Sequence, residues 1–404
     1  MFEVDVVIIG AGAAGLHCAA MAGQLGLKVL LIDHMAKVAE KIRISGGGRC
    51  NFTNLDTSPA NFASANPHFC RSALARYGPH DFISLLQRHQ IAFHEKHRGQ
   101  MFCDNSSEDV IAMLLRECDV AGVTRCQPCR VDSIQHSAAG FYLETSRGSV
   151  RSPRLVVASG GLSIPKIGAS DFGYRIARQF GHRIVETRPA LVPLTFDAGT
   201  WQPFAELAGS SLLARVSTGQ GKRAGEFIED LLFTHRGLSG PAILQISSFW
   251  QPGTALEIDL APETALRTAL IDAKSSSRRQ LVNCLADWLP RRLAEAWLSA
   301  GPLRDTADRP LADCRDKDLL QLADSLHRWE LLPTGTEGYR KAEVTAGGVD
   351  TREINSNSMQ SELQPGLFFI GEVMDVTGWL GGYNFQWAWA SAAACARALA
   401  GSPL

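Results

Sequence analysis

Apolar runs interrupted by glycine dominate the pattern of hydrophobic and polar positions at the start of the chain. The run Val6 to Ile9 is followed by Gly10, Gly12 and Gly15, then by a helical pattern and a second apolar run that ends at Asp33. Continuous apolar runs of this length are typical of buried parallel strands. Residues 4–33 therefore predict a strand, a helix and a second strand that lies parallel to the first.

The three glycines of this segment have separate roles in a dinucleotide-binding turn. Gly10 permits the tight turn, Gly12 lets backbone N–H groups approach a pyrophosphate, and Gly15 lets the helix pack against the strand. The phosphates would lie at the helix N-terminus, where unpaired N–H groups favour an anion. Asp33 would then accept hydrogen bonds from ribose hydroxyls. The alternative is a glycine-rich turn in an ordinary α/β core.

A second glycine cluster follows at residues 41–54. Gly46, Gly47 and Gly48 lie between Lys41 and Arg49. Glycine backbone can lie directly against a flat or anionic ligand, so we expect a second contact with the same cofactor. The alternative is a flexible surface loop.

Later patterns indicate a return to this cofactor site. A buried strand at residues 154–161 ends in Gly160 and Gly161, and another at 367–375 leads into Gly371 and two acids. Short apolar runs separated by Gly, Ser and Pro fill residues 195–262, and a helical pattern follows at 263–328. A nucleotide fold that returns through its last strand and helix suits FAD.

The predicted fold class is therefore α/β, with a two-dinucleotide-binding, Rossmann-like FAD domain that carries a β-rich insertion and a helical subdomain. We expect the first part of the FAD domain at residues 1–190 and its C-terminal return at 335–404. The β-rich insertion would span 191–262 and the helical insertion 263–334. Basic residues of the helical insertion could offer a face to RNA, although exposed charges are more often simply solvated.

Composition narrows the class of protein. The chain has 404 residues, 45% of them hydrophobic, and a formal net charge of −1, which excludes a wholly basic nucleic-acid binder. The ten cysteines are scattered and no secretory pattern is present, so we expect a cytoplasmic protein with reduced thiols. Cys126 and Cys129 lack a second pair at zinc spacing, so no metal is expected. Residues 385–399 predict a buried helix rather than a membrane span.

Several longer motifs resemble one known family. These are residues 44–54, Ile-Ser-Gly-Gly-Gly-Arg-Cys-Asn-Phe-Thr-Asn; 233–241, Phe-Thr-His-Arg-Gly-Leu-Ser-Gly-Pro; 342–349; and 371–375 with 381–384. Together they are similar to the BaiN/RdsA family of NAD(P)/FAD-dependent oxidoreductases, over essentially the whole chain. Within that family, the residues of these motifs are similar to those of the branch of bacterial ribosomal RNA dihydrouridine synthases. Cys103 is a departure, because many members have proline there.

The resemblance implies an enzyme that reduces a uridine C5=C6 bond in 23S ribosomal RNA to dihydrouridine, with FAD and with NADH or NADPH as electron donor. The RNA would be bound before ribosome assembly is complete, because the target base must leave its stack. Neither DNA nor a membrane is an expected partner. Two alternatives stay open: an FAD-dependent reductase of a small-molecule enone, and a non-catalytic, flavin-containing RNA-binding assembly factor.

The expected site residues fall into two groups. Hydride addition to uracil requires an acid near C5 or a donor to O4, and the candidates for this catalytic role are Cys103, His235 and Arg236. For Cys103 the alternative is a packed thiol that replaces proline. The expected FAD-binding residues are Gly10, Gly12, Ala14, Gly15, Asp33, Lys41, Ser45, Gly46, Gly47, Gly48, Arg49, Cys50, Asn51, Val131, Gly160, Gly161, Gly371, Glu372, Asp375, Gly381, Gly382, Tyr383, Asn384 and Phe385.

Overall fold

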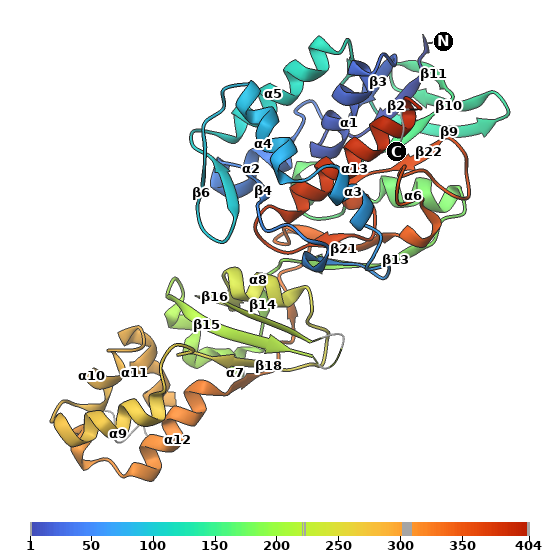
Figure 1. The fold of residues 1–404 in the computed structure, drawn as a ribbon. Helices are drawn as coiled ribbons and strands as arrows, with labels where there is room; N and C mark the ends of the chain where they lie inside the picture. The colour runs from blue at the N-terminus through green and yellow to red at the C-terminus, as the bar shows by residue number, and fades with distance from the viewer. Residues whose placement is uncertain (1, 220, 222–223, 301–308, 402–404) are drawn as a thin grey trace. The chain divides into compact units, whose positions relative to one another are not determined.

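The computed structural model describes residues 2–219, 221, 224–300 and 309–401. The chain divides into two compact units: unit 1 comprises Met1–Arg188 and Val344–Leu404, and unit 2 comprises Pro189–Glu343 (Figure 1). The chain leaves unit 1 along strand β13 (Ile184–Ala190) and returns along its pairing partner β21 (Val344–Val349). This return comes later than the boundary expected at residue 335.

A parallel sheet forms the centre of unit 1. Its strand order is β22 (Leu367–Phe369), β12 (Leu155–Val157), β2 (Val6–Ile9), β3 (Val29–Ile32) and β8 (Thr124–Cys126). All four neighbouring pairs are parallel. Every residue of β2 and β3 is buried, which explains why these strands are continuously apolar instead of alternating. The predicted strand, helix and strand unit and its α/β fold class are confirmed.

Two helices from opposite ends of the chain pack together beside this sheet. Helix α1 (Ala13–Gln24) follows β2, and α13 (Tyr383–Leu399) follows the last strand (Figure 1). Alanine at many positions of α13 allows the two backbones to approach closely, and nearly all of that helix is buried. No helix in the described part of the chain is long and apolar enough to cross a membrane.

Smaller elements surround the central sheet of unit 1. The antiparallel pairs β11 to β10 and β10 to β9 form one small sheet with β1, and β4, β7 and β6 form another. The remaining bounds are β1 (Phe2–Glu3), β4 (Asn51–Asn54), β5 (Phe62–Ala63), β6 (Phe93–Glu95), β7 (Gln100–Cys103), β9 (Val131–Ser137), β10 (Gly140–Thr145), β11 (Gly148–Ser152), β23 (Thr377–Gly378), α2 (Glu40–Ile44), α3 (Arg71–Arg76), α4 (Pro79–Arg88), α5 (Ser107–Val120) and α6 (Phe172–Gln179).

Unit 2 is built on an antiparallel sheet. Its strand order is β19 (Trp329–Leu331), β18 (Leu256–Asp259), β15 (Ser211–Thr218), β16 (Gly225–Thr234), β17 (Gly237–Ser239), β14 (Leu194–Thr195) and β20 (Gly335–Thr336). Strands β19 and β20 therefore come from segments that we expected to be helical and part of the FAD domain, respectively. A short apolar strand cannot be distinguished from a loop by periodicity alone, because its pairing partners are distant in sequence.

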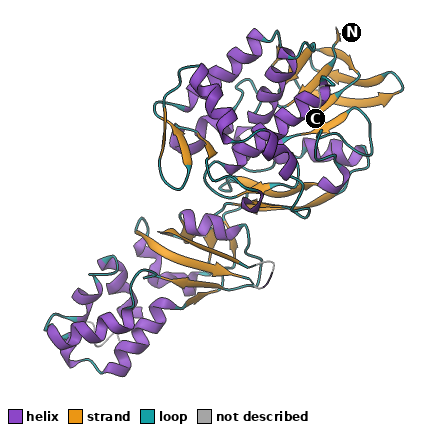
Figure 2. Ribbon diagram, in the orientation of Figure 1, coloured by secondary structure: helices purple, strands orange, loops and turns teal. Residues whose placement is uncertain are grey.

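The helices of unit 2 gather at one end of its sheet (Figure 2). They are α9 (Leu266–Ser276), α10 (Leu281–Leu285), α11 (Arg291–Ala300) and α12 (Asp316–His327), while α7 (Ala198–Trp201) and α8 (Pro241–Ser247) lie along the sheet. Aromatic rings join the helices to the sheet: the ring centroids of Phe204 and Trp329 are 5.0 Å apart, and those of Trp297 and Trp329 are 5.2 Å apart. Such contacts are typical of a packed core.

Candidate functional site

The glycine turn between β2 and α1 has the geometry that a bound diphosphate requires. Gly10 has φ +108°, and a Cβ there would lie 2.4 Å from the carbonyl oxygen of Ala158. A Cβ on Gly15 would lie 1.8 Å from the carbonyl oxygen of Gly10, whereas one on Gly12 would meet nothing within 4 Å. Gly10 and Gly15 are thus needed by the fold itself. Gly12 instead leaves open space in front of the helix N-terminus, where a pyrophosphate can approach.

Asp33, at the end of β3, is held in a fixed orientation beside this turn. Its Oδ2 accepts a hydrogen bond from the Ala11 N–H at 2.7 Å, and its Oδ1 accepts one from the Met35 N–H at 2.8 Å. A carboxylate can accept about four hydrogen bonds, so ribose hydroxyls can still bind. Val131 starts strand β9, where it pairs with Thr145.

The triple-glycine segment forms a tight loop with left-handed backbone. Gly46, Gly47 and Gly48 have φ values of +57°, +66° and +86°. A Cβ on Gly46 would lie 2.8 Å from the Phe102 ring, but one on Gly47 or Gly48 would meet nothing within 4 Å. The Ser45 hydroxyl donates to the Ile42 carbonyl, which fixes the start of the loop. Two consecutive glycines therefore expose backbone toward open space, as expected for a loop that contacts a ligand.

The residues after this loop differ in accessibility. Arg49 is exposed, whereas Cys50 is buried with φ +53°, and burial raises the pKa of its thiol well above the usual range. The Asn51 amide links this segment to the C-terminal return: its NH₂ donates to the Met101 carbonyl at 3.1 Å, and its oxygen accepts from the Gly382 N–H at 3.3 Å. Asn51 thus connects the end of the triple-glycine loop to β7 and to the start of α13.

Glycine also ends the neighbouring strand β12. A Cβ on Gly160 would meet nothing within 4 Å, while one on Gly161 would collide with the Thr345 hydroxyl at 2.5 Å and the Glu372 carboxylate at 2.8 Å. The Ser159 hydroxyl beside them is buried and has no hydrogen-bond partner. The backbone at Gly160 thus leaves open space after β12 that a bound molecule can occupy.

The C-terminal return meets the N-terminal helix at two small residues. Gly371 has φ +71°, and a Cβ there would lie 3.0 Å from the Cβ of Ala14 on α1. The Gly371 N–H donates to the Ser391 hydroxyl at 3.0 Å, and the Trp387 indole N–H donates to the Gly371 carbonyl at 3.2 Å. These contacts bring the strand β22 and its following turn beside the dinucleotide turn.

Lys41 and Glu372 form an ion pair at the same edge of the sheet. The distance from Lys41 Nζ to Glu372 Oε2 is 2.6 Å, and Lys41 Nζ also donates to the Ser163 hydroxyl at 2.5 Å. Glu372 Oε1 accepts from the Thr345 N–H at 2.9 Å and from the Ser163 hydroxyl at 3.2 Å. Sequence reasoning named Lys41 and Glu372 but missed Ser163 and Thr345, because no motif connects those positions with the cofactor turn.

Asp375 has a different environment from Glu372. Its side chain is almost fully buried, and its Oδ2 accepts hydrogen bonds from the Ala65 N–H at 2.7 Å and the Ser64 hydroxyl at 3.4 Å. Burial raises the pKa of this carboxyl above its ordinary value. Asp375 thus holds residues 64–65 in place. The cofactor contact expected of Asp375 stays a prediction.

Helix α13 begins at the last expected cofactor segment. Gly381 and Gly382 both have positive φ, and Gly382 is the residue that precedes the helix. The Asn384 side chain accepts from the Gly378 N–H at 2.8 Å and donates to the Gly378 carbonyl at 2.9 Å. Tyr383 is buried, and Phe385 stacks on Trp389. The unpaired N–H groups of the first turn suit an anionic edge of a ligand.

The three expected catalytic residues lie in different surroundings. Cys103 is fully buried in unit 1 at the end of β7, and burial raises its pKa to about 12. His235 and Arg236 form the exposed turn between β16 and β17 in unit 2, and Arg236 pairs with Glu337 at 3.3 Å. Of these three residues, only His235 and Arg236 have side chains exposed to solvent.

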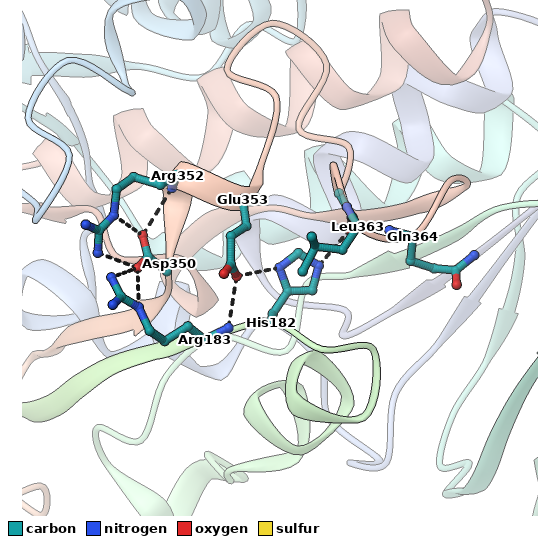
Figure 3. Close-up of polar contacts among 8 residues, drawn as sticks. His182, Arg183, Asp350, Arg352, Glu353, Leu363 and Gln364 are labelled. Atoms are coloured by element: carbon teal, nitrogen blue, oxygen red, sulfur yellow. Dashed lines mark hydrogen bonds and ion pairs between the residues drawn. The ribbon is translucent and has the colours of Figure 1, made fainter.

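A second polar cluster in unit 1 surrounds the buried carboxylate of Asp350 (Figure 3). Arg183 Nε donates to Asp350 Oδ2 at 2.8 Å and Arg352 Nε donates to Asp350 Oδ1 at 2.9 Å. His182 lies between Glu353, at 3.2 Å, and the Ser361 hydroxyl, at 2.7 Å. Because both arginines pair with the Asp350 carboxylate, this cluster fixes the turn after β21.

Unit 1 also contains a cavity of about 200 Å³ among α1, α4 and α5. His17 lines it; its Nε2 is buried without a hydrogen-bond partner, and burial lowers its pKa to about 4. Its ring packs against Tyr77 at a centroid distance of 5.1 Å. No expected cofactor residue lines this cavity. Elsewhere among the described residues, no group of acids, histidines and cysteines could hold a metal ion.

An open glycine turn at a helix N-terminus, an acid at the end of β3 and a C-terminal return beside them are typical of a dinucleotide-binding flavoprotein. The residues present fit FAD, because Gly12, Gly47, Gly48 and Gly160 leave open space that a Cβ would otherwise enter. Residues 4–398 match the family model of the HI0933-like protein Rossmann domain, so the chain belongs to the HI0933-like family.

Named relatives agree with this class. The chain is 50% identical to the ribosomal RNA dihydrouridine synthase of Escherichia coli (strain K12), over 99% of this chain and 98% of that protein. It is 28% identical to the 3-dehydro-bile acid delta(4,6)-reductase of Clostridium scindens, over 98% of this chain and 99% of that one. A solved quinol-fumarate reductase has the same fold, with a TM-score of 0.51, 14% identity and coverage of 99% and 71% of the two chains. The expected family is confirmed, and the protein is an FAD-dependent oxidoreductase.

Proposed function

We propose that this protein reduces the C5=C6 bond of a uridine in 23S ribosomal RNA, with electrons from NADH or NADPH, before ribosome assembly is complete. The observation that carries this proposal is the 50% identity, over nearly the full length of both chains, to a protein named as a ribosomal RNA dihydrouridine synthase. The cofactor site of unit 1 supports it, because bound, reduced FAD supplies the hydride that such a reduction needs.

The protein must then supply a proton or stabilise negative charge on the base. Hydride addition at C6 of uracil leaves an enolate, which a donor to O4 or an acid near C5 would stabilise. The turn His235–Arg236 is exposed, and its imidazole and guanidinium groups can donate a proton or a hydrogen bond to the base. Cys103 is buried with a raised pKa, so we favour His235 and Arg236 for this role and treat Cys103 as the rival candidate.

The helical part of unit 2 is a weaker candidate for the RNA surface than its arginines suggested. Acidic residues at 263–334 equal the basic ones in number, and Arg279 and Arg291 are paired with Asp287 and Glu295 at 2.8 and 2.9 Å. Paired surface charges attract phosphates less than unpaired ones. We therefore propose that RNA contacts depend on more than this helical part.

A small-molecule enone reductase is the second candidate. The 28% identity to a bile acid reductase favours it, because an enone and uracil are both C=C bonds conjugated to a carbonyl. The higher identity to the RNA enzyme places this alternative second.

The test compares ribosomal RNA from a strain lacking the gene with RNA from the same strain after complementation. Mass mapping of nuclease fragments should show a dihydrouridine that disappears in the deletion and returns with the wild-type gene. Complementation with the Gly12→Val variant serves as the control without cofactor. Identical dihydrouridine maps in all three strains would overturn the proposal. Purified protein supplied with NADH or NADPH separately would identify the donor.

A further inference from the structure

Four segments that are distant in sequence meet at one carboxylate in unit 1. Glu372 follows β22, Lys41 lies on α2, Ser163 follows the β12 turn, and Thr345 lies on β21. Each of the other three residues donates a hydrogen bond to Glu372, at 2.6, 3.2 and 2.9 Å. Carboxyl ends of parallel strands are where α/β sheets bind their ligands, so this carboxylate lies at the ligand-binding edge.

The hydrogen bonds leave Lys41 and Glu372 with unequal capacity. The Glu372 carboxylate can accept about four hydrogen bonds, and three donors already bind it. If Lys41 is removed, the negative charge of Glu372 is no longer neutralised by a cation. Lys41 has three N–H donors, of which one goes to Glu372 and one to Ser163. One N–H of Lys41 is therefore left, and its side chain is 31% exposed.

Chain neighbours of both residues contact the turn that we expect to receive the diphosphate. The Ala39 N–H, just before α2, donates to the Ala11 carbonyl at 3.0 Å. On the other side, Gly371 lies against Ala14, with 3.0 Å between the Cβ positions. The open space at Gly12 lies in this same turn. An uncompensated carboxylate so close to a phosphate site would repel the ligand that the turn is built to hold.

We propose that Lys41 screens Glu372 from the diphosphate of FAD and offers its remaining N–H to that anion, while Glu372 acts as a positioning residue that holds the ammonium in place. This inference concerns cofactor affinity and does not depend on the identity of the reduced substrate. It goes beyond the expectation that Glu372 is an FAD-binding residue, because it assigns the loss of affinity to an unpaired carboxylate charge.

The test is a double-variant cycle with Lys41→Met and Glu372→Gln. Holoprotein is stripped of FAD, and the dissociation constant is measured by retitration while flavin fluorescence is recorded. Lys41→Met should weaken FAD binding by about 100-fold or more, because it leaves a half-buried charge unpaired. Glu372→Gln should weaken it by about 3-fold at most, and the double variant should recover about 10-fold relative to Lys41→Met.

ADP and adenosine separate the phosphate effect from a general one. Lys41→Met should weaken ADP binding strongly and adenosine binding hardly at all, because only ADP carries the diphosphate. Lys37→Met removes an exposed lysine of the same segment and should leave all three ligands unaffected. Thermal melting of each stripped variant identifies those that fail to fold, and Lys41→Gln then replaces Lys41→Met. A double variant as weak as Lys41→Met, or equal losses for ADP and adenosine, would overturn the proposal.

Discussion

The two units of the molecule arrange their charges differently. In unit 1, Lys41 and Glu372 are partly buried and, together with Ser163 and Thr345, join four chain segments. In the helical part of unit 2, Arg267 pairs with Asp324 and Lys274 with Asp316 at the surface. Exposed pairs contribute little to stability and are screened by salt. The Lys41–Glu372 pair of unit 1 is thus shielded and held by neighbouring segments, whereas many charged residues of unit 2 maintain a solvated surface.

The strongest test of this difference changes two glycines of unit 1. Gly15→Val should prevent stable folding, because its Cβ would lie 1.8 Å from a carbonyl oxygen. Gly12→Val should fold, because its Cβ meets no protein atom within 4 Å, but should lose FAD. Circular dichroism and flavin absorbance of both purified variants check this. Full FAD occupancy in Gly12→Val would contradict the assignment of the turn.

The next prediction compares the catalytic contributions of a buried thiol of unit 1, Cys103, and an exposed residue of unit 2, His235. With equal flavin content, His235→Ala should slow single-turnover oxidation of reduced protein by RNA by about 10²–10⁴-fold, the range for a lost acid or donor. Cys103→Ala should keep a rate near that of the wild type, because the thiol is buried. A large loss in Cys103→Ala alone would transfer the role to the thiol.

His17 should make the stability of unit 1 depend on pH. The folded-state pKa of His17 is lowered to about 4, mainly by burial, while its ordinary value is 6.5. Between pH 6.5 and about 4, His17 is protonated in the unfolded chain but not in the folded chain. The free energy of unfolding therefore falls by about 1.4 kcal/mol for each unit that the pH is lowered through this range. Urea unfolding of the wild type and His17→Phe at pH 7 and pH 5 measures this loss. Equal pH dependence in both would exclude His17 as its source.

The smallest expected effect lies on the helices of unit 2. Reversal of charge at Arg279 and Arg291 should change RNA affinity by about 3-fold or less, because both side chains are already paired with acids and such surface pairs contribute little. Filter binding at several salt concentrations gives both the affinity and the salt slope. A much lower affinity with a reduced slope would show that these arginines contact phosphates.

Local patterns predicted the dinucleotide turn well, because Gly10, Gly12 and Gly15 act within one short segment. The Lys41 and Glu372 positions were also named from motifs. Their connection through Ser163 and Thr345 could not be predicted, since it depends on how distant strands pair. The burial of Asp375 and the closing strand Trp329–Leu331 were missed for the same reason: single positions carry no signal of tertiary contacts.

The most direct measurement of the central claim follows flavin and base together. Protein reduced without oxygen is mixed with 23S ribosomal RNA that lacks the modification, and flavin absorbance is recorded while RNA fragments are weighed by mass spectrometry. The account predicts that flavin is reoxidised as one uridine gains two hydrogens, in equal amounts. Flavin that stays reduced with RNA but is reoxidised by a small enone would contradict it.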